Sequence, residues 1–125
     1  LFAEIGGLPS EQGMSEITLA RALARRGESE AARALAREAE SRLESEADAE
    51  GALTPHARRV ILAGSGRVEL ATGHPEAARR RLREALEIPA LDLAADRHLI
   101  ERIQRDLDSM PARETTALGT GSAPD

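Results

Sequence analysis

One segment of this chain occurs almost twice, and that repetition limits the folds that the chain can adopt. Residues 24–39 read ARRGESEAARALAREA and residues 70–85 read LATGHPEAARRRLREA, so the two copies lie 46 positions apart. Aligned on Gly27 and Gly73, both copies carry only alanine or glycine seven positions before, five after and twelve after the glycine. The matched pairs are Ala20 and Gly66, Ala32 and Ala78, and Ala39 and Ala85. Small residues at helical spacing predict two helical hairpins whose helices cross closely.

The composition favours an all-α fold with a core of small aliphatic side chains. Phe2 is the only aromatic residue among the 125. Alanine, glutamate, arginine and leucine dominate, and all four are strong helix formers. No segment shows the alternation of apolar and polar residues that a β-strand needs. A chain of this length is expected to form one domain.

Capping residues and glycines predict where the hairpins begin and turn. The first hairpin is expected over residues 15–47, with Ser15 and Ser29 as helix caps and Gly27 at the turn. Thr54 followed by proline is a strong start for a third helix, because the hydroxyl caps and proline suits the first turn. The sequence therefore predicts a second hairpin over residues 55–88, which turns at the second repeat glycine and ends before a proline.

A further helix and two outer segments complete the predicted organisation. Asp92 can cap a helix over residues 92–109, which we expect to act as a C-terminal capping helix of the 15–109 domain. Residues 1–14 are expected to be a lead-in segment. Residues 110–125 are small and polar, and we expect a disordered tail there.

The spacing of the small residues resembles that of the tetratricopeptide repeat. The second copy matches the residues that this family favours more closely than the first copy does. The matching residues are Leu62, Gly66, Gly73, Ala78, Leu82, Ala85 and Pro89. The resemblance covers roughly residues 15–89 and implies a short solenoid of stacked antiparallel hairpins. The period of 46 exceeds the usual length of about 34 residues, and the usual aromatic residues are missing. An unrelated helix bundle is the alternative.

The resemblance also implies a concave peptide-binding groove, lined by the first helix of each hairpin. The residues that it places there are Met14, Ile17, Arg21, Ala24, Arg25, Val60, Ala63, Arg67 and Leu70. Arg21 and Arg67 occupy equivalent positions, six before the glycine of each copy. Two guanidinium groups above an apolar strip can bind a carboxylate or a phosphate bidentately. In the alternative interpretation, both arginines are solvated and pair with nearby glutamates.

The sequence carries no motif for catalysis, a cofactor or a metal. It has no cysteine, and His56, His74 and His98 do not fall at metal-binding spacings; the first two are expected to face solvent. The glycines of AGSGRVE, residues 63–69, lie within a predicted helix, which indicates close helix packing rather than phosphate binding. The acidic run EAESRLESEADAE, residues 38–50, is expected to be a solvated helix face.

These features predict a non-catalytic scaffold that binds a protein or peptide, with an acidic or C-terminal segment as the favoured partner. A net charge of −5 disfavours nucleic acid, and no apolar run is long enough to cross a membrane. A cytoplasmic location is expected, within a larger bacterial regulatory or signalling protein. The alternatives are a structural spacer or self-association domain and, less favoured, a helical segment of a transcription regulator.

Overall fold

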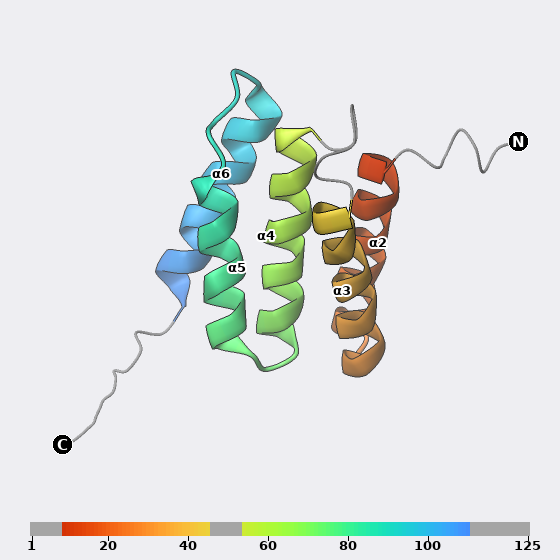
Figure 1. Ribbon diagram of the computed structural model, residues 1–125. Helices are drawn as coiled ribbons and strands as arrows, with labels where there is room; N and C mark the ends of the chain where they lie inside the picture. The colour runs from red at the N-terminus through yellow and green to blue at the C-terminus, as the bar shows by residue number, and fades with distance from the viewer. Residues whose placement is uncertain (1–8, 46–53, 111–125) are drawn as a thin grey trace, which may run out of the picture.

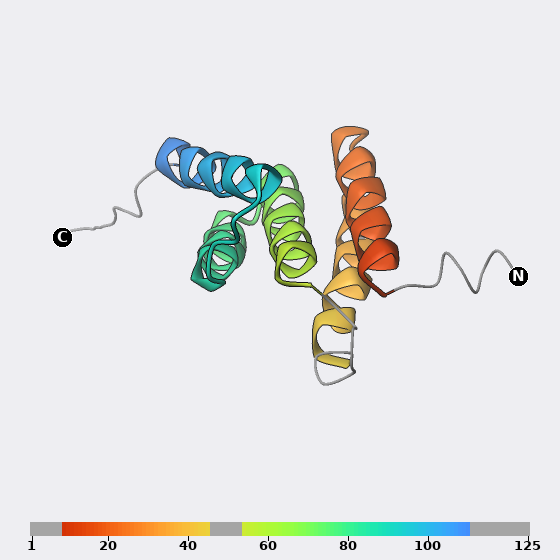
Figure 2. The ribbon, with the colours of Figure 1, turned by 90° about the horizontal axis from the view of Figure 1, so that it is seen from above.

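Five helices arranged as stacked hairpins make up the part of the chain that the structure describes. The computed structural model describes residues 9–45 and 54–110, and within these ranges it contains no β-strand. The helices are α2 (Pro9–Arg25), α3 (Ser29–Ser45), α4 (Pro55–Ala71), α5 (Pro75–Glu87) and α6 (Ala94–Ser109). Helices α3 and α5 lie on one side of the molecule, α2 and α6 on the other, and α4 between them (Figures 1 and 2). The predicted all-α fold of stacked hairpins is confirmed.

The two hairpin turns are built in the same way, as the repeat predicts. Gly27 and Gly73 adopt positive φ angles of 84° and 90°, a conformation that glycine adopts without steric cost. The amide of the next residue then donates back into the preceding helix, from Glu28 to the Leu23 carbonyl at 3.0 Å and from His74 to the Glu69 carbonyl at 2.8 Å. This pattern satisfies carbonyl groups that the helix end leaves without partners.

The starts of the helices follow local sequence signals less faithfully than the turns do. Thr54 caps α4 as predicted, because its hydroxyl oxygen accepts from the Ala57 amide at 3.0 Å. Asp92 does not cap α6: Leu93 occupies the N-cap position, and the Asp92 carboxylate accepts from Arg97 at 3.1 Å instead. The prediction for Asp92 was therefore wrong.

Helix α2 begins at Pro9, six positions before the predicted start at Ser15. Proline is tolerated in a first helical turn, and Gly13, which looks like a helix breaker, lies inside the helix. A Cβ atom at Gly13 would lie 2.6 Å from the Cδ1 atom of Ile61 in α4. The glycine therefore admits a side chain from the next hairpin, and this contact explains its place within the helix.

The core within each hairpin consists of the small residues that the repeat identified. Ala20, Ala32, Ala39, Ala78 and Ala85 are all fully buried. In the second hairpin, Gly66 leaves room for the fully buried Leu82, since a Cβ atom on this glycine would lie 2.9 Å from the leucine Cγ atom. The first hairpin has two alanines at the equivalent positions, Ala20 and Ala36.

Glycines also bring the two hairpins together. Ile17 of α2 packs over Gly64 of α4, where a Cβ atom would lie 2.5 Å from the isoleucine Cγ1 atom. Together with the contact between Gly13 and Ile61, this forms a reciprocal pair of glycine and isoleucine contacts between α2 and α4. The glycines in AGSGRVE therefore serve close helix packing, as the sequence predicts.

Three segments lie outside the described residues: 1–8, 46–53 and 111–125. They include part of the predicted lead-in, the end of the first predicted hairpin with its connection to the second, and most of the predicted tail. Met110, which the sequence analysis places in the tail, is described, and its side chain is buried against Ile103 and neighbouring apolar residues. The second core cluster therefore extends one residue past the end of α6.

Candidate functional site

A buried ion pair joins α4 to the start of α6. Arg59 and Asp96 are both 0% exposed, and Nε and Nη2 of the arginine donate to the two carboxylate oxygens at 2.9 Å each. Nη1 donates to the carbonyls of Ala85 and Ile88 at 2.6 and 2.7 Å, and Nη2 also donates to the Pro89 carbonyl at 2.8 Å. All five N–H donors of the guanidinium are therefore engaged. The pair fixes the end of α5 and holds α6 beside α4.

Two more donors reach the Asp96 carboxylate. The amide of Leu91 donates at 2.9 Å, and Nδ1 of His56 lies 2.7 Å from Oδ1. Hydrogen bonds from Arg59, supported by those from His56 and Leu91, hold the pKa of Asp96 well below its usual range even though burial acts in the opposite direction. His56 was expected to face solvent, but its side chain is 27% exposed and belongs to this network.

The arginines of the predicted groove gather on the side of the molecule formed by α2, α4 and α6. Arg21, Ala24 and Arg25 of α2 line a hollow of about 160 Å³ together with Arg67 and Ala71 of α4. The structure thus brings Arg21 and Arg67, from equivalent positions in the two copies, to one place.

The charges around this hollow are unbalanced. Nε of Arg67 donates to Oδ2 of Asp106 in α6 at 2.8 Å, and Nη2 of Arg67 lies 2.7 Å from the same oxygen. Arg21 is half-buried and makes no hydrogen bond or ion pair within the described ranges. Burial lowers the pKa of Arg21, and repulsion from Arg67, Arg102 and Arg25 lowers it further. We call the surface formed by these four arginines the arginine face; Asp106 is the carboxylate that counteracts their repulsion.

Not every residue of the predicted groove lies on an open surface. Ile17 and Ala63 are 1% and 2% exposed, so they belong to the helix interfaces and cannot contact a bound peptide. Met14 and Val60 are half-buried, whereas Leu70 is 40% exposed at the end of α4. The surface open to a partner is therefore narrower and more basic than the spacing predicts.

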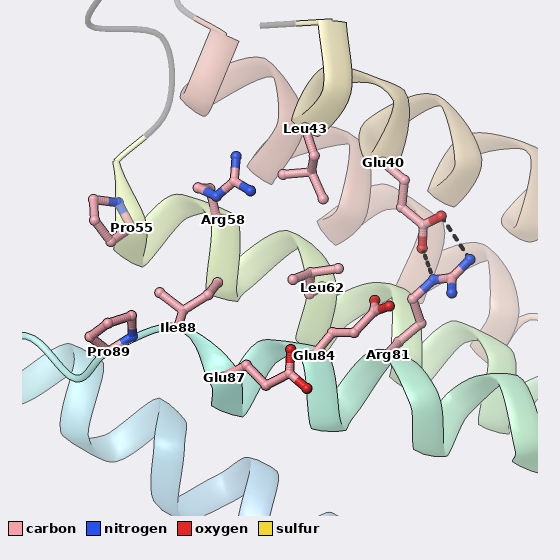
Figure 3. A pocket seen from close by; sticks show the side chains of 10 residues that line it. All are labelled: Glu40, Leu43, Pro55, Arg58, Leu62, Arg81, Glu84, Glu87, Ile88 and Pro89. Atoms are coloured by element: carbon pink, nitrogen blue, oxygen red, sulfur yellow. Dashed lines mark hydrogen bonds and ion pairs between the residues drawn. The ribbon is translucent and has the colours of Figure 1, made fainter. Parts of the chain in front are cut away.

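A larger pocket, which the sequence analysis did not identify, lies between α3, α4 and α5 (Figure 3). Its volume is about 690 Å³. The apolar part of its lining consists of Leu43, Leu62 and Ile88, with Pro55 and Pro89 at one end. Residues of both hairpins line it, so it exists only once the hairpins have stacked.

One wall of this pocket is held in place by an ion pair between α3 and α5. Nε and Nη2 of Arg81 donate to the two oxygens of Glu40 at 2.5 and 3.1 Å, and Ser65 donates to the same carboxylate. The hydrogen bond to Glu40 raises the pKa of Arg81 above its ordinary value, although burial opposes this. Glu40 belongs to the acidic run expected to be solvated, so for this residue the expectation was wrong.

The other charged groups of the pocket form no hydrogen bond or ion pair with a described residue. Arg58 stands on the α4 wall near Pro55, and Glu84 and Glu87 stand on the α5 wall (Figure 3). Within the part of the chain that the structure describes, none of these three side chains makes a hydrogen bond or an ion pair. The spacing of the two glutamates, three residues apart on one predicted helix, is a sequence signal that could have indicated this acidic wall.

Two further kinds of feature are absent from the described residues. Residues 9–45 and 54–110 contain no group of three or more histidine, aspartate or glutamate side chains that could hold a metal ion. Among the helices of these same ranges, none combines the length and apolar character that crossing a membrane requires.

The repeat architecture has a counterpart among known protein families. The family model of the tetratricopeptide repeat matches residues 14–38 and 56–84. The first match covers most of α2 and the first part of α3, and the second covers α4 and most of α5. No curated protein and no solved structure matches the chain significantly.

Proposed function

Because the chain is a tetratricopeptide-repeat-like helical protein, we propose that it is a non-catalytic scaffold that binds an acidic segment of a protein partner on its arginine face. Repeats of this family are typically protein-interaction modules without catalytic activity.

The observation that carries this proposal is the state of Arg21. Its guanidinium is half-buried among Arg25, Arg67 and Arg102, and it makes no ion pair within the described ranges. A carboxylate placed in the hollow would relieve the repulsion among these cations, and it would accept two parallel hydrogen bonds from one guanidinium. The protein as a whole carries a net charge of −5, so this concentration of positive charge is local.

The surroundings of the hollow suit a peptide better than a free ion. Ala24 and Ala71 contribute small apolar surfaces to its lining, and Leu70 exposes an aliphatic side chain next to Ala71. A peptide can therefore place a carboxylate against the arginines and an apolar side chain against the end of α4. The carboxylate can come from an acidic side chain or from a chain terminus, and a binding experiment distinguishes the two.

The test uses three fluorescein-labelled octapeptides and measures fluorescence anisotropy at low salt. One peptide carries central glutamates and an amidated C-terminus, the second has glutamines in their place, and the third has glutamines and a free C-terminus. We expect the glutamate peptide to bind at least about tenfold more tightly than the amidated glutamine peptide, and the preference to weaken as salt is added. Tight binding of the third peptide alone would assign the site to a terminal carboxylate.

Matched charge reversals test the location of the site. Arg21→Glu breaks no hydrogen bond or ion pair within the described ranges and should weaken binding of the glutamate peptide at least about tenfold. Arg37→Glu makes the same change in charge at an exposed position of α3 and should leave binding unchanged within about twofold. Equal binding by both variants would refute the proposal. If no peptide binds and the chain sediments as a dimer, self-association becomes the better interpretation.

A further inference from the structure

We propose that the pocket between α3, α4 and α5 is a second docking site, which takes an aliphatic side chain of a partner protein flanked by basic residues. This site is independent of the arginine face. Arg58 in the pocket and Arg67 on the arginine face are nine residues apart on α4, which is two and a half helical turns. The two sites therefore lie on opposite sides of α4 and can be occupied together.

The floor of the pocket provides the contact for an aliphatic side chain. Leu43, Leu62 and Ile88 come from α3, from α4 and from the residue that follows α5, and all three are only half-buried (Figure 3). Covering this water-exposed apolar surface with a partner lowers the free energy of the system. The volume of about 690 Å³ lies within the range of ligand pockets, about 300–1,000 Å³, and leaves room for the residues on either side of the anchor.

The charges of the walls select the neighbours of that anchor. Glu84 and Glu87 lie about one turn apart on α5, and neither makes a hydrogen bond or an ion pair with a described residue, although both also line a neighbouring hollow with Arg80 and Arg83. Arg81 attracts Glu84 electrostatically, but its hydrogen bonds go to Glu40, so it forms no ion pair with either glutamate. A lysine or arginine next to the anchor can therefore pair with this wall, whereas an acidic neighbour would be repelled by it.

Arg58 adds a donor on the opposite wall of the pocket. Its guanidinium stands on α4 near Pro55 and has no partner within the described ranges (Figure 3). It can donate to a backbone carbonyl of the bound segment while the basic side chain faces α5. The two walls thus fix how an extended segment lies across the apolar floor.

The test follows the amide signals of the ¹⁵N-labelled full chain as peptides are added. The probes are synthetic nonapeptides of glycine and serine with a central leucine, flanked on both sides by lysine, serine or glutamate. We expect the lysine-flanked peptide to shift signals of residues around the pocket and to bind at least tenfold more tightly than the glutamate-flanked peptide. Replacing its leucine by serine should abolish the shifts. Equal affinities, or shifts confined to the arginine face, would overturn the proposal.

Paired variants identify the acidic wall as the cause of the preference. Glu84→Gln with Glu87→Gln should reduce the preference for lysine over glutamate to within twofold. Glu30→Gln with Glu38→Gln removes the same charge from exposed positions of α3 and should leave the preference intact; loss of the preference in this control would contradict the proposal. Because Arg21→Glu should not affect the lysine-flanked peptide, failure at one site is distinguishable from failure at the other.

Discussion

The contact of α2 with α4 differs from the contact of α4 with α6. Between α2 and α4, isoleucine side chains pack over glycines in both directions, so this junction is built from apolar contacts. Between α4 and α6, Arg59 pairs with Asp96 and Arg67 with Asp106, and the two helices contact each other less extensively. The residue 46 positions before Arg59 is Gly13, so one position of the repeat carries no side chain in α2 and an arginine in α4.

This difference shows how one repeat plan accommodates two kinds of neighbour. Glycine removes the side chain and lets two helices approach closely, whereas arginine reaches across to a helix that contacts its neighbour less extensively. The stability of the first junction rests on packing, whereas the second adds ion pairs and hydrogen bonds to the apolar packing of the buried Ile103. The two junctions should therefore respond differently to substitution and to pH.

Breaking the charged junction should have the largest effect. Arg59→Met leaves the buried Asp96 without its main partner, and removing one member of a buried pair costs about 3–5 kcal/mol. Urea denaturation followed by circular dichroism measures the loss. The neighbouring variant Arg58→Met removes an arginine with no partner in the described structure and should change stability by less than about 0.5 kcal/mol. A loss below about 1 kcal/mol for Arg59→Met would show that the pair does not hold α6.

Overfilling the apolar junction should have the next largest effect. The Cβ atom introduced by Gly64→Val would lie 2.5 Å from Cγ1 of Ile17, close to the backbone end of that side chain. We expect a loss of about 1–3 kcal/mol from overpacking, although valine has the higher helix propensity. In a double-mutant cycle, adding Ile17→Ala to Gly64→Val should cost less than Ile17→Ala alone. Strict additivity would mean that the two residues do not press on one another.

Lowering the pH should affect the α4–α6 junction, which contains the buried Asp96, more than the α2–α4 junction. Since the pKa of Asp96 is lowered in the folded state, its contribution to stability is complete well above the unfolded pKa near 3.9 and is lost progressively as the pH falls from about 5 toward the lower folded pKa. The difference in unfolding free energy between wild type and Asp96→Asn should thus shrink from pH 5 to pH 2, by up to about 1.4 kcal/mol per pH unit. Gly64→Val keeps Asp96 and should parallel wild type. A constant difference between wild type and Asp96→Asn would contradict this assignment.

Features of the fold that depend on neighbouring residues could be predicted from the sequence. The turns at Gly27 and Gly73 and the cap at Thr54 are local, so the residues around them are sufficient to identify them. The start of α2 could not be found in this way, because Gly13 is explained by a contact with Ile61, 48 positions later. The N-terminus of α6 was misassigned to a capping aspartate for the same reason, since the buried network around it comes from α4 and α5.

The two candidate sites also differ in how far they could be predicted from the sequence. Equivalent positions in the repeat predict that Arg21 and Arg67 lie near one another, and the structure places both at one hollow. Whether that hollow binds a partner stays a prediction. The family spacing did not separate the open surface from the buried Ile17 and Ala63. Successive residues of a helix are rotated by about 100° around its axis, so residues close to the groove in sequence can already face the core. The pocket between α3, α4 and α5 depends on the stacking of two hairpins, which no local pattern specifies.

The five donors of Arg59 also have a consequence for how the chain folds. The carbonyls that this side chain satisfies lie 26 to 30 residues after it, and its carboxylate partner lies 37 residues after it. The end of α5 therefore lacks these donors until α4 is in place, and Arg59 lacks its carboxylate partner until α6 is in place. Opening of any one of these helices exposes unpaired polar groups in the others. Helices α4, α5 and α6 should thus form a single cooperative unit, whose amides exchange with solvent together.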